Sequence, residues 1–405
     1  MTSVARVPIQ RNPRYKRNGL KSYVYLLNKY SFVPTLRGPY SAARGKKALF
    51  KQNADGTQGE VPATDQQNDS LYTCPVKIGT PGQTLNLDFD SGSSDLWCWS
   101  TELPQSTRSA GKGHTIFDPS KSSTFKNQSQ STWQIQYGDQ SSASGTVGTD
   151  NIQIGDITVK AQAIELANKL ASQFTQDASS DGLLGLAFGS INTVQPTPVK
   201  TPVENMIAQD DIPQNMELFT CYLGSIKDAN EESFYTFGQI DQSVVPSGSQ
   251  VAYTPVDNSQ GFWMFDSTSA KVNGKTIQLS GNKAIADTGT TLLLASDEVC
   301  QAVYSAIPGA KQDSSQQGWV FPADTAEADL PTVTFMVGNT PITIEKQHLA
   351  FAGGLEGNMA YGGIQSRGDL TFDILGDTFL QNVYAVFDVG NTQFGVVQRA
   401  PPSTS

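Results

Sequence analysis

Residues 85–97 read LNLDFDSGSSDLW, and the rest of the chain is organised around this stretch. Leu85, Leu87 and Phe89 alternate with polar residues, which is the period-two pattern of a half-buried strand. The strand runs into Asp90 and a turn of small residues, where glycine adopts backbone angles that a bulkier residue would resist. A carboxylate between two apolar strands needs hydrogen-bond partners, because desolvation disfavours its charge. The neighbouring hydroxyl groups can supply them.

A second stretch repeats this design. Residues 283–293 read KAIADTGTTLL: apolar strand, aspartate, hydroxyl residue, glycine, two hydroxyl residues and apolar strand. Each copy is followed by an apolar pair and a glycine, LLG at 183–185 and ILG at 374–376. The spacing from aspartate to glycine is 95 residues in the first copy and 89 in the second. This is an internal duplication on the scale of a domain, much longer than a solenoid repeat.

These motifs identify a family. From about Tyr72 to Arg399 the chain resembles the pepsin-like aspartic endopeptidases, and most closely their secreted fungal members. The resemblance implies a mainly β, bilobal pepsin-like acid protease fold, with two homologous β-rich lobes and the active cleft between them. We expect a basic prosegment and linker at 1–68, an N-terminal lobe with the first Asp motif and the flap at 69–246, and a C-terminal lobe with the second motif at 247–405.

Length and composition fit this expectation. The 405 residues can hold two sizeable domains and an extension, and 36 Gly with 21 Pro favour many turns and short strands. No run of 18 or more apolar residues could span a membrane. The first residues, MTSVARVP, lack the apolar core of a secretory signal. Either the signal is missing from this sequence or export uses another route. We favour the first and expect a secreted protein, with the vacuole as second choice.

Charge divides the chain sharply. Residues 1–51 hold twelve Lys and Arg and no acidic residue, which leaves 16 basic and 38 acidic residues in the remainder, a net of −22. A basic arm ahead of an acidic body is most simply explained by neutralisation within the molecule. The alternative is a nucleic-acid or membrane tether, which the interleaved tyrosines of the arm would suit. Survival of the arm in the mature protein would support the tether, whereas its loss at acid pH would not.

The arm carries one segment with helical spacing of apolar residues, Gly19–Tyr30. Fungal relatives end a prosegment helix with a Lys-Tyr pair, and Lys29-Tyr30 matches it. The resemblance therefore places Lys29 between the two catalytic aspartates, where an ammonium would hold both carboxylates ionised and block the cleft. A solvated basic helix is the alternative. Residues 52–68 are polar and read as a flexible linker, and Lys46-Lys47 is a candidate dibasic processing site.

Peptide hydrolysis without a metal or a covalent nucleophile needs a base to activate water and an acid to protonate the leaving group. Two carboxylates that share one proton supply both, and aspartic proteases are the standard example of this pattern. We expect Asp90 and Asp287 to flank one water molecule. One carboxylate accepts its proton while the other donates to the scissile carbonyl oxygen, and the initial proton belongs to the pair. Activity should therefore be favoured at acid pH.

The resemblance assigns supporting roles around the dyad. Ser93 and Thr290 match residues that hydrogen-bond the aspartates, and Ser91 and Thr288 match the pair whose hydroxyls lock the two loops together. Most relatives have Thr where Ser91 stands, so this chain keeps the hydroxyl and loses one methyl. The full supporting set consists of the remaining residues of the two turns: Ser91, Gly92, Ser93, Thr288, Gly289 and Thr290.

A hairpin expected at residues 133–141 matches the family's flap, which closes over the substrate and excludes water. Tyr137 matches the flap tyrosine, Gly138 follows it, and Trp97 matches the tryptophan that hydrogen-bonds that tyrosine. Asp139 matches a flap aspartate that lets some fungal members accept Lys before the scissile bond. Taken alone, either aromatic residue would more often fill a core.

Other chemistries fit the sequence poorly. No CxxC or HExxH metal motif, no GxSxG elbow and no phosphate-binding GxxxxGK[ST] loop is present, and we expect neither a metal nor a cofactor. Cys74 and Cys98 either form a disulfide or, like Cys221 and Cys300, are small buried side chains. We expect His114 to be solvated in a polar loop and His348 to be structural.

The sequence thus predicts an aspartic endopeptidase made as a zymogen. Its expected partners are proteins or peptides with bulky apolar residues around the cut, and with Lys as a further candidate at P1, together with pepstatin-type inhibitors. We expect a monomer that binds neither nucleic acid nor membrane. A pepsin-like fold used only for binding is the rival, although both aspartates, Tyr137 and Trp97 are retained. Asn68 and Asn127 lie in glycosylation motifs.

Overall fold

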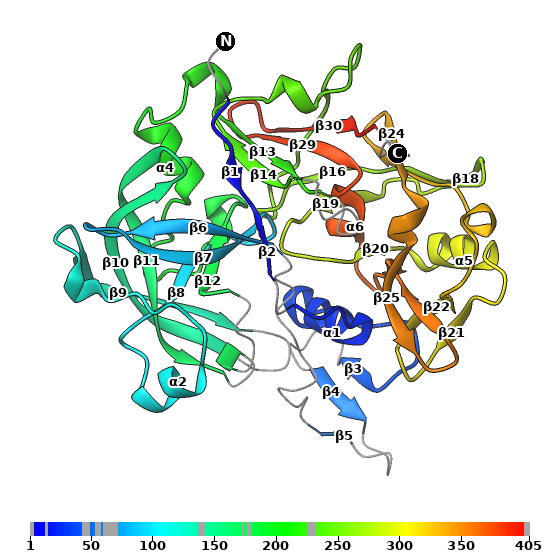
Figure 1. Ribbon diagram of the computed structural model, residues 1–405, viewed down its shortest axis with the longest axis horizontal. Helices are drawn as coiled ribbons and strands as arrows, with labels where there is room; N and C mark the ends of the chain where they lie inside the picture. Colours follow the sequence, from blue (N-terminus) through cyan, green and yellow to red (C-terminus); the bar gives the residue numbers. More distant parts are fainter. Residues whose placement is uncertain are drawn as a thin grey trace.

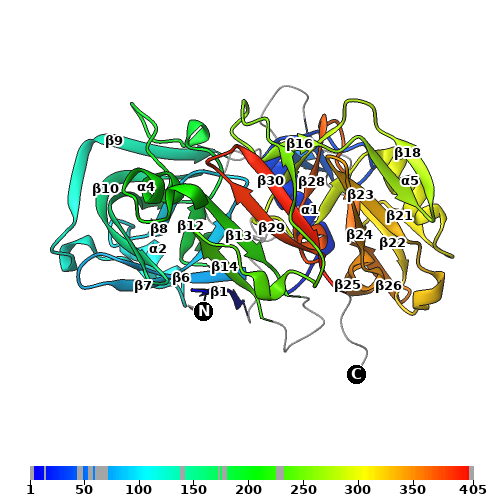
Figure 2. The same ribbon diagram turned by 90° about the horizontal axis from the view of Figure 1, so that it is seen from above.

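The computed structural model describes residues 4–12, 15–42, 49–52, 58–59, 72–136, 142–171, 174–175, 180–224 and 232–400. Strands dominate this part of the chain, which confirms the mainly β fold class. The blue-green segments and the yellow-orange segments form two bodies side by side, and the red C-terminal strands lie between them (Figures 1 and 2).

The first body is built on an eight-stranded sheet, which begins with a short strand from the arm. In sheet order its strands are β2 (Gln10–Arg11), β6 (Tyr72–Ile78), β7 (Gln83–Asp90), β12 (Gly182–Gly185), β8 (Leu96–Trp99), β11 (Ile157–Leu170), β10 (Ser142–Ile154) and β9 (Lys126–Gln136). Strand β7 is more deeply buried than its alternation predicts, because Asp88 and Asp90 are buried together with Leu87 and Phe89. Its C-terminal end lies in the interior of the protein.

The second body contains a five-stranded sheet and two four-stranded sheets. The five-stranded sheet has the order β16 (Met264–Asp266), β19 (Lys283–Ala286), β28 (Phe372–Leu375), β20 (Leu293–Ala295) and β27 (Ile364–Ser366). The first four-stranded sheet has the order β18 (Lys275–Gln278), β17 (Ser269–Val272), β23 (Val333–Val337) and β24 (Thr340–Ile344). The second has the order β21 (Lys311–Asp313), β22 (Gly318–Pro322), β26 (Met359–Gly362) and β25 (Ala350–Leu355).

A six-stranded sheet connects the two bodies and takes strands from both ends of the chain. Its order is β1 (Val7–Pro8), β14 (Phe234–Phe237), β13 (Leu218–Tyr222), β29 (Val383–Asp388), β30 (Gln393–Gln398) and β15 (Ala252–Pro255). Strand β29 is buried along its whole length. The sheet therefore holds the two bodies in a fixed relation through strands on both sides of residue 246.

The helices of the described residues are short. They are α1 (Gly19–Tyr30), α2 (Gln105–Ala110), α4 (Pro202–Ala208), α5 (Asp297–Ser305) and α6 (Asp377–Leu380), with 3₁₀ turns η2 (Pro119–Lys121), η3 (Gly189–Ile191), η4 (Gln214–Met216), η5 (Gln242–Val244), η6 (Glu327–Asp329) and η7 (Lys346–Leu349). The Ser296 side chain caps α5 by accepting a hydrogen bond from the Val299 N–H at 3.4 Å. The side chains of α2 are not buried.

The arm lies against both bodies. Helix α1 starts at Asn18, whose Oδ1 accepts a hydrogen bond from the Lys21 N–H at 3.0 Å, and the helical prediction for residues 19–30 is confirmed. Its apolar face packs into a cluster with side chains of the second body. Figure 1 shows α1 in front of the strands of this body. The arm side chains in this cluster are Tyr23, Val24, Leu26, Leu27, Phe32, Tyr40 and Leu49, with Leu49 from the small sheet β3 (Tyr40–Ala42), β4 (Leu49–Gln52), β5 (Gln58–Gly59).

A second anchor fixes the start of the arm. The Arg6 guanidinium donates to Asp241 Oδ2 at 2.8 Å and to Glu232 Oε2 at 2.5 Å, and its plane lies 4.1 Å from the Phe234 ring centroid. Strand β1 then pairs with β14. This second anchor pairs a basic residue of the arm with two carboxylates of the acidic remainder of the chain, as the charge asymmetry predicts. No helix in the described part of the chain is long and apolar enough to cross a membrane.

Candidate active site

The two Asp motifs occupy equivalent places in the two bodies. Strand β7 ends at Asp90 and runs parallel to β12, with Gly185 opposite Asp90. Strand β19 runs parallel to β28, and the next residue, Asp287, donates its N–H to the Leu375 carbonyl at 3.1 Å. In each body the apolar-apolar-Gly strand also pairs antiparallel with the strand that follows the motif, β8 in one case and β20 in the other. The duplication seen in the sequence is therefore a duplication of topology.

Reciprocal hydrogen bonds join the two motifs across the interface. The Ser91 N–H donates to Thr288 Oγ1 at 3.0 Å, and the Thr288 N–H donates to Ser91 Oγ at 2.9 Å. Each hydroxyl donates in turn to a carbonyl of the opposite body, Ser91 to Ala286 at 2.8 Å and Thr288 to Phe89 at 2.6 Å. All four groups are buried, so each would be costly to leave without a partner. The predicted lock between the loops is present.

Each carboxylate accepts hydrogen bonds from its own turn. Asp90 Oδ1 accepts from the Gly92 N–H at 2.8 Å, and Oδ2 accepts from the Ser93 hydroxyl at 2.6 Å. Asp287 repeats the arrangement, with donation from the Gly289 N–H to Oδ1 at 3.0 Å and from the Thr290 hydroxyl to Oδ2. Thus both carboxylates are oriented by equivalent donors.

Glycine is required in both turns because the turn of one body approaches the carboxylate of the other. A Cβ on Gly92 would lie 2.6 Å from Asp287 Oδ1, and a Cβ on Gly289 would overlap Asp90 Oδ1. The two aspartates can meet only if both positions lack a side chain.

The arm fills the space between the aspartates. Lys29 Nζ lies 2.9 Å from Asp90 Oδ1 and 2.9 Å from Asp287 Oδ2, and it also donates to the Gly289 carbonyl at 3.3 Å. The Tyr30 hydroxyl donates to Asp287 Oδ2 at 2.6 Å. The structure therefore places Lys29 between the two aspartates, as the resemblance implies, and it places the Tyr30 hydroxyl beside Asp287.

The environment separates the protonation of the two carboxyls. Burial raises the pKa of Asp90 to about 6, against the Lys29 ammonium and with a contribution from the Asp287 charge. Burial also raises the pKa of Asp287, but the Lys29 ammonium and the neighbouring hydrogen bonds outweigh burial and lower the pKa of Asp287 to about 2. For Lys29, burial lowers the pKa and the two carboxylates raise it, with a net rise well above the ordinary value. The ammonium thus stays charged in the cleft, and the proton of the dyad belongs to the pair.

Beside the aspartates is a cleft of about 730 Å³, a usual size for a ligand site. Its walls include residues that the sequence analysis did not single out, among them Ile191, Thr193 and Phe262. These residues belong to no local motif, and only their placement next to the Asp turns identifies them. Phe262 and Phe372 also receive Tyr30, whose ring centroid lies 6.0 Å and 6.5 Å from theirs.

The flap is described only in part. Strands β9 and β10 are its two arms, with Gln136 paired to Ser142. Tyr137, Gly138 and Asp139 lie outside the described residues, as do Lys46, Lys47 and Asn68. Trp97 is buried at the base of the hairpin, where it stacks on Trp133 at 6.0 Å. Its indole Nε1 has no hydrogen-bond partner among the described residues.

Other candidate residues lie away from the site. The four cysteines are free and buried, so of the two alternatives for Cys74 and Cys98 the structure shows small buried side chains and no disulfide. Strands β7 and β12 lie between β6, which carries Cys74, and β8, which carries Cys98. The expectation that His114 is solvated is also wrong. Its ring stacks on Trp99 at 4.0 Å, its side chain is 1% exposed, and Nδ1 lies 3.8 Å from Asp181 Oδ1.

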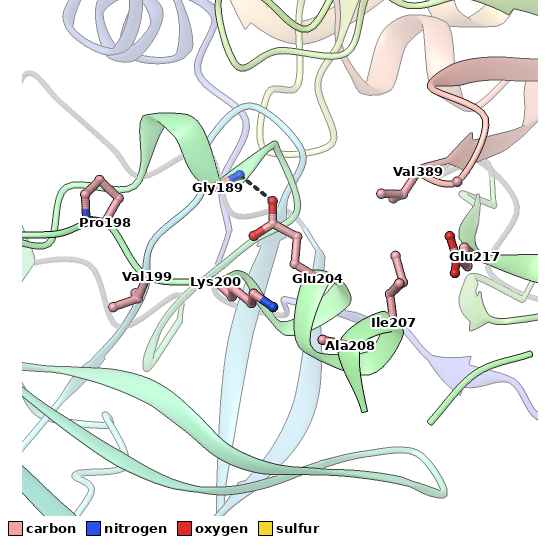
Figure 3. Close-up of a pocket in the computed structure, with 10 residues that line it drawn as sticks. Gly189, Pro198, Val199, Lys200, Glu204, Ile207, Ala208, Glu217 and Val389 are labelled. Carbon is pink, nitrogen blue, oxygen red and sulfur yellow. Dashed lines mark hydrogen bonds between the residues drawn. The ribbon is translucent and has the colours of Figure 1, made fainter. Parts of the chain in front are cut away.

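His348 fulfils the structural expectation, because it is buried and its Nδ1 lies 3.0 Å from Asn382 Oδ1. A separate groove lies between α4 and the turn after β29, apart from the aspartate pair (Figure 3). Glu204 points across this groove, and its carboxylate accepts hydrogen bonds from the N–H groups of Gly189 and Thr201, both at 2.9 Å. These bonds satisfy the Glu204 carboxylate and cap the N-terminus of α4, so this carboxylate has a structural role.

A bilobal β fold in which each lobe contributes one aspartate to a buried pair is the arrangement of the aspartic proteases. The family described as eukaryotic aspartyl protease matches residues 71–399, and the chain belongs to this family. It is therefore a pepsin-like peptide hydrolase, an aspartic-type endopeptidase that acts on peptide substrates.

Similar proteins come from fungi. Endothiapepsin of Cryphonectria parasitica is 42% identical over 383 residues, which cover 94% of this chain and 87% of that protein. Aspergillopepsin-1 of Aspergillus oryzae is 42% identical over 354 residues, or 87% of this chain and 83% of the relative. Aspartic protease pepA of Arthroderma gypseum is 39% identical over 389 residues, 91% of each chain.

The reciprocal bonds between the Asp turns predict the effect of one substitution. Ser91→Ala leaves the buried Thr288 N–H without its acceptor, and it should lower the free energy of unfolding by about 1–3 kcal/mol. Urea denaturation followed by tryptophan fluorescence measures this loss. Ser91→Thr is the matched control, because it keeps the hydroxyl. A Ser91→Ala protein as stable as the Thr variant would show that the bonds contribute nothing.

Proposed function

We propose that Asp90 and Asp287 are the catalytic dyad of this endopeptidase and that the full chain is its inactive zymogen. The observation that carries the proposal is the Lys29 ammonium between the two carboxylates, 2.9 Å from each. An ion in that place excludes both water and a substrate carbonyl. The same geometry that makes the pair suitable for acid–base chemistry thus keeps it idle while the arm is bound.

Once the arm leaves, one water molecule takes the place of Lys29 Nζ between the carboxylates. The carboxylate that is ionised accepts a proton from this water, and the protonated one donates to the scissile carbonyl oxygen. Ser93 and Thr290 keep both groups oriented through their hydrogen bonds. The rates of the two proton transfers then depend on a pair that holds a single proton, which acid pH favours.

The arm has the properties of a prosegment. We assign residues 1–68 to the prosegment and linker, 69–246 to the N-terminal lobe, and 247–405 to the C-terminal lobe. The arm covers the aspartates, supplies β1 and β2 at sheet edges, and is joined to an acidic body by its basic side chains. The linker at residues 52–68 and the Lys46-Lys47 pair are the candidate places for removal of the arm.

Substrate preference follows from the cleft. The Tyr30 ring packs against both Phe262 and Phe372, which supports acceptance of bulky apolar residues at the same place. The unpartnered indole N–H of Trp97 at the base of the flap supports a hydrogen bond to Tyr137 when the flap closes. Gly138 would continue the flap, and Asp139 would attract a Lys side chain before the scissile bond.

The pH dependence of arm release has a defined sign. The Lys29 ammonium lowers the pKa of both carboxyls, so they bind protons less tightly while the arm is bound than after it leaves. By linkage, the contribution of this contact to arm binding is complete above the arm-free pKa values and decreases as the pH falls. For Asp287 the decrease continues down to its pKa of about 2. Acid should therefore release the arm.

The remaining assignments rest on the family. We propose a secreted monomer, with the vacuole as second choice, that pepstatin-type inhibitors block and that needs no nucleic acid or membrane. A binding module with the same fold is the rival function. A tether made of the arm is less well supported, because Lys29, Tyr30 and the apolar face of α1 are already engaged within the chain.

Incubation at acid pH tests the proposal. We expect the full chain, held at about pH 3–4 with a denatured protein, to lose roughly its first 50–70 residues and to cleave the substrate. Pepstatin should abolish both reactions, and Asp287→Asn should reduce them by about 100- to 10,000-fold or more. Mass spectrometry locates the new N-terminus. A folded protein that cleaves nothing after removal of the arm would favour the binding module.

A second prediction concerns the lock itself. Lys29→Met keeps the side-chain stem but removes the charge, and it should let the arm leave at about pH 6, where we expect the wild-type chain to stay intact. The rate of N-terminal processing, followed on gels across pH, measures this shift. Lys16→Met, which alters an exposed lysine ahead of the same helix, is the matched control. Identical processing of all three proteins would contradict an inhibitory role for Lys29.

A further inference from the structure

The loop that carries Asp90 ends in a second buried pair of carboxyls. Asp95 lies in the stretch between β7 and β8, Glu165 lies on β11, and the two residues are 3% and 1% exposed. Asn192 Nδ2 donates to both, to Asp95 Oδ1 at 3.1 Å and to Glu165 Oε1 at 3.0 Å. No basic side chain of the described residues forms an ion pair with either carboxyl.

The hydrogen bonds show which carboxyl carries the proton. Asp95 Oδ1 accepts from the Thr193 N–H at 2.8 Å, from the Thr193 hydroxyl at 2.9 Å and from Asn192, as an ionised oxygen does. Glu165 Oε2 is buried and receives no hydrogen bond. A proton on this oxygen, donated to Asp95, satisfies both groups. Burial, followed by the Asp95 charge, raises the pKa of Glu165 well above its ordinary value, in agreement with this assignment.

The duplicated body shows what the fold needs at these two places. Trp97 lies seven residues after Asp90 and pairs with Glu165, and Leu294 lies seven residues after Asp287 and pairs with Gln365. Gln365 is therefore the counterpart of Glu165, and Leu292 is the counterpart of Asp95. Gln365 is fully buried and exchanges hydrogen bonds with the Trp319 backbone. The architecture thus accepts a neutral amide at the position of Glu165, and only the first body carries a carboxyl pair.

The pair is connected to the Asp90 turn through one continuous set of bonds. The Gly185 N–H donates to the Asp95 carbonyl at 2.8 Å, and the Leu186 N–H donates to the Asp90 carbonyl at 2.8 Å. Asn192 Nδ2 also donates to the Ser94 carbonyl at 3.2 Å. The carboxylate of Asp95 thereby joins the turn to residues 191–193 of the cleft wall.

We propose that Asp95 and Glu165 are positioning residues that share one proton, and that this proton holds the Asp90 turn and the cleft wall together at acid pH. When the proton leaves, two like charges face each other in a dry site with a single amide between them, and the repulsion separates β11 from the turn. The Asp90 carboxylate then loses its fixed orientation. The pair limits the active form of the first lobe to acidic conditions independently of the protonation of the dyad.

The surroundings offer no alternative compensation. The Cys98 thiol on β8 is the other titratable group coupled to Glu165, and its ionisation would add a further negative charge. On residues 191–193 the facing groups are the Asn192 amide and the Thr193 N–H and hydroxyl, which are neutral. Nothing in the described environment therefore replaces the proton when it is lost.

Because the second body has Gln365 at the position equivalent to Glu165, the substitution Glu165→Gln tests the proposal. In Glu165→Gln the side chain can still donate to Asp95 and accept from Asn192, but it cannot ionise. Wild type, Glu165→Gln and the exposed-surface control Glu298→Gln are activated from the full chain at about pH 4 and incubated at a series of higher pH values. They are then returned to about pH 4 and assayed. Reversible deprotonation of the dyad does not affect this residual activity.

We expect kcat/KM at acid pH to be unchanged in Glu165→Gln within about twofold, and the midpoint of irreversible loss to move upward by about one pH unit or more. Tryptophan fluorescence of the stacked Trp97–Trp133 pair should show the same shift. The inference rests on the proposed role of Asp90, so fluorescence is also recorded on full chains that carry Asp287→Asn, where no catalysis is needed. If the activated wild-type protein shows no activity but Glu165→Gln still shifts the fluorescence midpoint, the dyad assignment is overturned and the present inference stands.

A midpoint identical to that of wild type in both readouts would overturn the inference. Asp95→Asn serves as the second variant, because it removes the partner charge and should also raise the midpoint. Since both amides replace a pair that is neutral or singly charged at acid pH, both proteins should fold at about pH 4. Failure of both to fold there would likewise exclude the shared proton.

Discussion

Two carboxylates buried side by side are the constraint on which this structure depends. Like charges at short distance cannot both ionise without compensation, and burial increases the cost. Asp90 and Asp287 are compensated by donors of their own turns and by one ammonium from the arm. The turns can approach only because Gly92 and Gly289 have no side chain. Each of these features would be unnecessary if the aspartates lay apart.

The arm contributes the positive charge that compensates the two carboxylates, and it is not part of either lobe. Its helix is held by an apolar cluster against the second body, and this packing does not depend on pH. Its charged contacts at Lys29 and Arg6 do depend on the ionisation of carboxylates. The apolar contacts thus determine the position of the helix, and the ion pairs make the binding of the arm depend on pH.

The two lobes are alike in topology and different in chemistry. Both place a parallel strand next to the Asp strand, and both add a neighbour parallel to the strand after the motif. At the equivalent register position one lobe carries Glu165 and the other carries Gln365. Comparison of the two lobes therefore distinguishes two kinds of residue. Those found at equivalent positions in both lobes are required by the fold, and those found in one lobe only, such as Glu165, are not.

The sequence by itself determined the class of fold, the aspartate pair and the supporting turns. These features depend on local order, strand then carboxylate then turn, and the second copy in register excludes coincidence. The expected place of Lys29 came from the family resemblance, because no local pattern around Lys29 points to the aspartates. Tertiary structure alone decided that Asn192 bridges Glu165 and Asp95, that His114 stacks on Trp99 and that Cys74 and Cys98 stay apart. The reason is the sheet order β6-β7-β12-β8-β11, which separates consecutive strands and joins distant ones. Local pattern does not encode that order, because it arises from packing between segments far apart in the chain.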